Sequence, residues 1–188
     1  GRNTAMSLAM QQLYASDKHQ KTAKLQRKVW AHGMKLSSMA YVVARNHPNL
    51  NQESAFLCGL MNDIGKLYIL TKAEDFPEFL GNPSSLNLVL DEWNPQISKS
   101  IIESWGFPQE IAESADPASY VDPDPKSVPQ LVDVVVVAKM LVDGNEEKLQ
   151  KMFDEDPSCQ KLGVNEESAA ELMSAYREKL QNMQQSLS

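Results

Sequence analysis

The stretch GLMNDIGKL, residues 59–67, decides the fold of this chain. Apolar side chains surround it on nearly every helical face, over a segment that we expect to be one helix from Gln52 to Leu70. A helix that is apolar all round is buried inside a protein. Gly59 and Gly65 each weaken a helix, and close approach of neighbouring backbones explains them best. Asp63 therefore places a carboxylate in the core, which is costly unless a partner compensates its charge.

A second polar residue, His32, lies on the apolar stripe of the preceding predicted helix, which runs from about Ala23 to Asn46. The stripe steps by three and four residues and consists of Leu25, Val29, His32, Leu36, Met39 with Ala40, and Val43. Two polar groups that face inward from consecutive helices indicate one shared internal site. Two interpretations stay open, half of a metal site or a hydrogen-bonded polar pair inside the core.

Helical periodicity continues along the rest of the chain and predicts an all-α bundle. A first short helix is marked by Met6, Met10 and Leu13, and residues 71–91 are expected to be irregular. The further predicted helices span residues 95–105, 108–115, 128–142, 146–154 and 166–186. A capping box of Ser127 and Gln130 is expected to begin the helix over 128–142.

We expect a single domain over residues 1–188, with a core of about 23–143 followed by C-terminal helices of about 145–186. The large apolar residues predicted to be buried are Trp30, Phe56, Leu60, Leu67, Ile101 and Trp105.

Composition excludes several classes of function. The net charge of −7 disfavours a reader of duplex DNA, and no apolar run reaches the roughly 18 residues of a membrane span. Two distant cysteines, Cys58 and Cys159, argue against a disulfide scaffold or a zinc ribbon and fit a reducing cytoplasm. One basic patch runs over Lys18, Lys21, Lys24, Arg27 and Lys28, either as a solvated face or as a contact for a phosphate or an acidic partner.

GLMNDIGKL resembles the GLLHDIGKL signature of HD-superfamily domains. Trp30-Ala31-His32 before it and Trp105-Gly106-Phe107-Pro108 after it are similar in order and spacing to the HDOD branch, a hydrolase-related output domain. Residues 162–173 resemble that branch's C-terminal helix. The resemblance implies an HD-domain-like helical bundle from a bacterial signalling protein, here without the first N-terminal helices of a complete HDOD domain.

The resemblance also implies which residues would hold a metal. An active HD domain uses a first histidine, an adjacent His-Asp pair and a later aspartate. His32 matches the first histidine and Asp63 matches the paired aspartate, but Asn62 replaces the paired histidine. The later aspartate is expected near Lys139, so that a cation replaces it. We therefore predict no metal and no cofactor, only a vestigial pocket of His32, Asn62, Asp63 and Lys139 in which the ammonium takes over the charge of the metal.

These residues favour a non-catalytic signalling domain that interacts with an unidentified protein partner. One alternative is a metal-dependent phosphohydrolase that acts on a nucleotide or cyclic dinucleotide. Another is a nucleotide- or nucleic-acid-binding module that uses the patch from Lys18 to Lys28, although the net charge makes nucleic acid an unfavourable partner.

Overall fold

The computed structural model describes residues 21–187, and every regular element in that range is helical. The predicted helix around Met6, Met10 and Leu13 lies outside the described residues. The first elements are α2 (Ala23–Val43), η2 (Ala44–Asn46), α3 (Gln52–Met61), α4 (Ile64–Ala73), α5 (Pro77–Leu80) and α6 (Pro83–Ser104). The later elements are α7 (Gln109–Glu113), α8 (Pro117–Tyr120), α9 (Leu131–Asp143), α10 (Glu146–Glu155), α11 (Pro157–Leu162) and α12 (Glu166–Leu187). This architecture confirms the all-α bundle.

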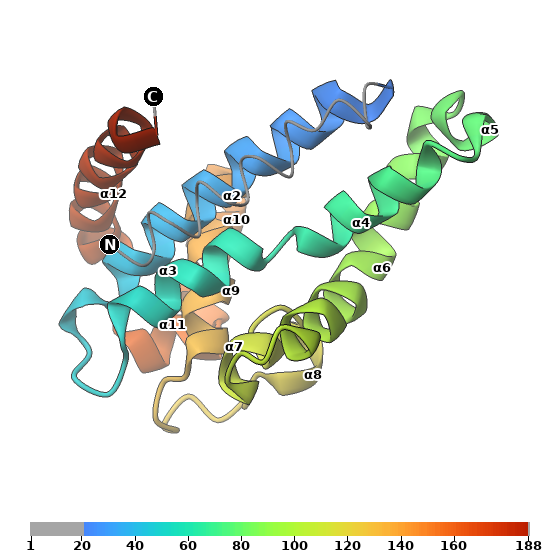
Figure 1. Cartoon of the computed structure of the whole chain (residues 1–188). Helices are drawn as coiled ribbons and strands as arrows, with labels where there is room; N and C mark the ends of the chain where they lie inside the picture. Colours follow the sequence, from blue (N-terminus) through green and yellow to red (C-terminus); the bar gives the residue numbers. More distant parts are fainter. Residues whose placement is uncertain (1–20, 188) are drawn as a thin grey trace.

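The long helix α2 organises the bundle, because α3, α9 and α12 all pack against it (Figure 1). Gly59 permits the contact between α2 and α3, since a Cβ there would lie 2.6 Å from the backbone of Leu36. Of the predicted core residues, Phe56, Leu60 and Leu67 are buried, and Trp30 and Ile101 are half-buried against the core. Trp105 is 45% exposed, so its predicted burial is wrong. It follows the end of α6, where Gly106 turns the chain with a φ of 79°.

Helix α4, helix α5 and the first half of α6 form an arm (residues 64–93) beside the main core. Figure 1 shows α4 and α6 side by side, with α5 at their far end, away from α12. A small separate cluster of buried side chains holds the arm together, namely Leu70, Ala73, Leu86 and Leu90. The amide and hydroxyl of Thr22 both donate to Glu74 at 2.7 Å, which ties the start of α2 to the end of α4.

The predicted continuous helix over 52–70 is wrong, because the chain breaks at Asn62 and Asp63. Helix α6 satisfies the backbone groups that the break releases. The carbonyl of Asn62 accepts hydrogen bonds from Asn94 Nδ2 and Ser98 Oγ, and these side chains accept from the amides of Lys66 and Gly65. A Cβ at Gly65 would lie 2.7 Å from the Asn94 carbonyl, so this contact requires glycine. Tertiary hydrogen bonds thus replace helical ones at the centre of the signature.

Two helix starts also differ from prediction. Helix α6 begins twelve residues before Pro95, at Pro83, after Asn82 caps it by accepting from the amide of Ser85. The Asn82-Pro83 pair therefore begins a helix, and residues 83–91 are not irregular. Helix α9 begins at Leu131 and not at Val128, because its capping box is formed by Gln130 and Asp133.

The C-terminal helices α10 and α12 match their predicted ranges within one residue at each end, and α11 was not predicted. A buried ion pair fastens α11 to α9, with Lys161 Nζ 2.9 Å from Asp133 Oδ1 and both side chains fully buried. Asp133 also accepts from Ser158 Oγ at 2.6 Å and from the Gln130 amide at 2.8 Å. Across residues 21–187, none of the helices combines the length and apolar character needed to cross a membrane.

Candidate functional site

The imidazole of His32 joins three parts of the fold. Its Nδ1 lies 2.6 Å from Asp63 Oδ2, at the junction between α3 and α4. Its Nε2 lies 2.9 Å from both carboxylate oxygens of Asp143, the last residue of α9. The predicted meeting of His32 and Asp63 is therefore confirmed, and we name His32, Asn62, Asp63 and Asp143 the His32 cluster.

His32 carries a positive charge in this position. Hydrogen bonds to Asp143 and to Asp63 raise its pKa from 6.5 to about 9, although partial burial acts against the charge. A protonated ring donates one N–H to each carboxylate. Asp143 stands at the carboxyl end of α9, where the helix dipole disfavours an anion and favours a cation, so the imidazolium compensates it there.

Asp63 is buried and ionised. Burial opposes its ionisation, but the hydrogen bond from His32 and the charges of Lys66, His32 and Lys139 hold the pKa of this carboxyl below its usual range. Asn62 Nδ2 donates to the second oxygen, Asp63 Oδ1, at 3.0 Å. Both oxygens of Asp63 are thus occupied by neighbouring side chains of the protein.

The predicted position of the α9 residue is corrected by one helical turn. No hydrogen bond or ion pair joins Lys139 to Asp63 among the described residues, so its ammonium acts only through space. The side chain of α9 that contacts His32 is Asp143, one helical turn beyond Lys139. The positive charge that the sequence predicted for the ammonium group of Lys139 is instead carried by protonated His32. Its imidazolium lies between the carboxylates of Asp63 and Asp143.

Sequence reasoning also missed Asn94 and Ser98, which position the backbone of the cluster from α6. A signal existed, since both interrupt the apolar stripe that Leu86, Leu90 and Ile102 form at four-residue intervals. Polar residues on such a stripe indicate buried hydrogen-bonding partners.

The donor set does not fit a hydrolytic metal ion. Within residues 21–187, no three His, Cys, Asp or Glu side chains are placed to hold one. The two nitrogens of His32 point to carboxylates on opposite sides of its ring, and Asn62 contributes a neutral amide. A metal that activates water needs several anionic or imidazole ligands converging on one point, with a position left open.

A cavity of about 310 Å³ adjoins the His32 cluster between α2, α4 and α6. Lys28 and Lys66 border it, together with Asn87 and Asp91, and Lys66 Nζ lies 3.3 Å from Asp91 Oδ1. Positive and negative groups are therefore mixed around its mouth. Of the predicted basic patch, Lys21, Lys24, Arg27 and Lys28 are exposed at the start of α2, and Lys18 lies outside the described residues.

The sequence model of the HDOD domain family matches residues 1–119, which include His32 and the whole junction at Asp63. The chain belongs to the HDOD family. A crystal structure described as a "putative metal-dependent phosphohydrolase" from Shewanella amazonensis SB2B has a TM-score of 0.77 to this HDOD chain. The two share 22% sequence identity over 98% of this chain and 67% of the other, and at that identity the likeness shows the fold alone. A search of curated proteins gives no significant match.

Proposed function

We propose that this HDOD chain is a non-catalytic domain of bacterial cytoplasmic signal transduction, which acts by binding a protein partner. The observation that carries the proposal is the position of His32 between Asp63 and Asp143. The side chains that would have to converge on a metal ion instead form hydrogen bonds with one another. Asn62 completes the arrangement by donating to Asp63.

Exposed aromatic and aliphatic side chains on the arm support the binding of a partner. Five large apolar residues of the arm are exposed, namely Tyr68, Phe76, Phe79, Leu88 and Trp93. Apolar patches on a soluble protein mark interaction surfaces more often than single exposed residues do. The arm has its own small core, so it presents these side chains on a folded support.

The catalytic part of the proposal is tested by metal binding and turnover. Chelator-treated protein is titrated calorimetrically with Mn²⁺, Mg²⁺ and Fe²⁺, and is screened with nucleotides, cyclic dinucleotides and a chromogenic phosphate ester. We expect neither stoichiometric binding nor turnover. Asn62→His, which restores the His-Asp pair of the signature, is the matched variant that should gain metal affinity if residue 62 is what prevents it. Metal-dependent turnover in the parent that disappears in Asp63→Asn would overturn the proposal.

The binding part is tested by capturing partners from a cytoplasmic extract with parent and variant chains. Phe76→Ser with Phe79→Ser, which changes no residue of α4 or α6, should lose the partner. Val128→Ser is the control, because Val128 is 61% exposed but lies outside the arm. Equal capture by all three chains would exclude the arm as the binding surface.

A metal-dependent phosphohydrolase is the second candidate function, and Asp143 favours it. The sequence accounts for two of the family's ligands, and the structure adds a carboxylate beside the same histidine. The same metal titration decides between the two functions.

A further inference from the structure

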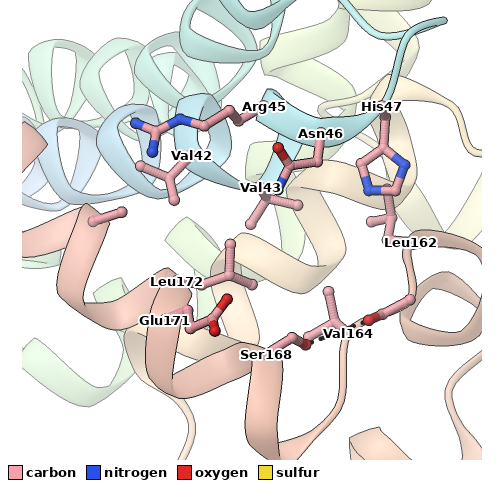
Figure 2. Close-up of a pocket in the computed structure, with 12 residues that line it drawn as sticks. Val42, Val43, Arg45, Asn46, His47, Leu162, Val164, Ser168, Glu171 and Leu172 are labelled. Atoms are coloured by element: carbon pink, nitrogen blue, oxygen red, sulfur yellow. Dashed lines mark hydrogen bonds between the residues drawn. The ribbon is translucent and has the colours of Figure 1, made fainter.

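A second cavity lies at the other end of α2, away from the His32 cluster. It has a volume of about 310 Å³ and opens between the end of α2 with η2 and the segment from Leu162 to Ala175 (Figure 2). That segment follows the last residue matched by the HDOD family model, residue 119. The cavity therefore joins an element of the family core to the C-terminal helices.

The floor of this cavity is aliphatic. It is formed by Val42, Val43, Leu162, Val164 and Leu172. The first four are buried, and Figure 2 shows Val43 and Leu172 pointing toward each other from the two walls. Branched aliphatic side chains of this kind accept a small saturated group and disfavour a charged one.

The rim carries two opposite charges without partners. Arg45 projects from η2 and Glu171 projects from α12, on the two walls of the cavity (Figure 2). Both side chains are exposed, and neither forms an ion pair or a side-chain hydrogen bond with another residue of the described part of the chain. The hydroxyl of Ser168, also on the rim, is already bonded to the carbonyls of Gly163 and Asn165. Asn46 and His47 also border the cavity, so its free polar groups are one guanidinium, one carboxylate, one amide and one imidazole (Figure 2). Arg45 and Glu171 contribute its formal charges.

We propose that this cavity binds a free aliphatic α-amino acid of the leucine, isoleucine or valine type. The guanidinium of Arg45 would hold the ligand's carboxylate through two parallel hydrogen bonds, the geometry that arginine favours. The carboxylate of Glu171 would hold the ammonium group, and the branched side chain would cover the aliphatic floor. The volume is at the lower end of the range for small-molecule sites, about 300–1,000 Å³.

The charges on the rim distinguish this ligand from others. A phosphate or a dicarboxylate would meet one arginine and be repelled by Glu171, whereas a fatty acid would leave Glu171 without a partner. A zwitterion satisfies both groups at once. Bound there, the amino acid would connect η2 to α12. The inference does not depend on whether the His32 cluster is catalytic, because no residue of that cluster lines this cavity.

Calorimetric titration of the full chain with L-leucine tests the proposal. Two analogues of the same shape are the matched ligands, 4-methylpentanoate without the ammonium group and 3-methylbutylamine without the carboxylate. We expect leucine to bind, and each analogue to bind at least about tenfold more weakly, since each leaves one charge of the rim unpaired. Binding of the carboxylate analogue as tightly as leucine, or no heat and no chemical-shift change with leucine at millimolar concentration, would overturn the proposal.

Two variants locate the site. Arg45→Gln and Glu171→Gln change exposed side chains and should fold like the parent, as circular dichroism will check, while each lowers leucine affinity at least about tenfold. Arg27→Gln and Glu178→Gln remove the same charges from exposed positions outside the cavity and should leave affinity unchanged. Equal affinity in all four variants would place the leucine elsewhere and reject this cavity. These readouts are independent of metal binding and turnover, so the proposed function can fail while this inference stands.

Discussion

Helix α9 carries a carboxylate near each end, and different cations compensate the two. Asp133, in the first turn, pairs with Lys161 from α11, and both side chains are fully buried. Asp143, the last residue, pairs with His32 from α2, and its side chain is 49% exposed while that of His32 is 28% exposed. One pair is sealed inside the protein, and the other opens onto the cavity beside the arm.

The difference separates a sealed ion pair from one that solvent reaches. Asp133 stands where the helix dipole favours an anion, and it also accepts from Ser158 and from the Gln130 amide. Asp143 stands where the dipole disfavours an anion and needs the imidazolium. The pKa of His32 is raised to about 9, so only the second pair loses its cation as the pH rises through the mildly alkaline range. The His32 cluster is open to the neighbouring cavity, although its groups form hydrogen bonds with one another.

The largest effect should come from breaking the sealed pair. Lys161→Met leaves Asp133 buried without a cation, and we expect it to lower the free energy of unfolding by about 3–5 kcal/mol. Urea denaturation followed by circular dichroism measures the change. Adding Asp133→Asn should recover much of the loss, because the uncompensated charge disappears. Lys151→Met, at an exposed position of α10, is the control and should stay within about 0.5 kcal/mol of the parent.

The next effect is a pH dependence that only the His32 cluster should show. The pKa of His32 is about 9 in the folded chain and 6.5 without these contacts. The folded value is the higher one, so the stabilisation is complete below about pH 6.5 and is lost as the pH rises toward 9. The difference corresponds to at most about 3 kcal/mol. Urea denaturation between about pH 6 and about pH 7.5 covers part of this loss and keeps the thiols of the unfolded chain mostly protonated.

Two variants isolate the contribution of His32 to this slope. His32→Gln should lose most of the dependence, whereas His47→Gln should keep it, because His47 contacts neither carboxylate. Lys161→Met should lower the whole curve without changing its slope in this range. A slope that is the same in His32→Gln and in the parent would show that the imidazolium does not hold the cluster together.

The sequence alone predicted the bundle and half of the cluster. Three- and four-residue periodicity sufficed for α2, α10 and α12, whose apolar faces pack on one side. It failed at the junction between α3 and α4, because the break depends on Asn94 and Ser98, which lie about thirty residues away. Local propensity contains no information about such tertiary hydrogen bonds. The expectation that residues 71–91 are irregular fails at Asn82-Pro83, because an N-cap followed by proline begins a helix.

The prediction of which α9 residue lies beside His32 failed for a related reason. Val128 to Val142 is so uniformly apolar that its sequence does not show which face meets His32, and no flanking motif fixes the register. Lys139 and Asp143 are one turn apart on the same face, so either fits the periodicity. Only the packing of α9 against α2 selects Asp143. Asp143 therefore adds a second carboxylate to the His32 cluster, where the sequence predicted an ammonium group.

The smallest effect on stability should come from Asp143→Asn, and it tests the open side of the comparison directly. Water screens an ion pair of which one member is half exposed, so the free energy of unfolding near pH 6 should fall by about 1 kcal/mol or less. The removal of an anion from the carboxyl end of α9 offsets part of that loss. The pKa of His32 should fall with the stability, because the hydrogen bond to Asp143 is the largest cause of its increase and one pKa unit corresponds to about 1.4 kcal/mol. We therefore expect the His32 ring to titrate in NMR spectra below the parent's value of about 9, with the fold unchanged. An unchanged titration would mean that Asp63 alone holds the proton, and the two carboxylates of α9 would then differ only in burial.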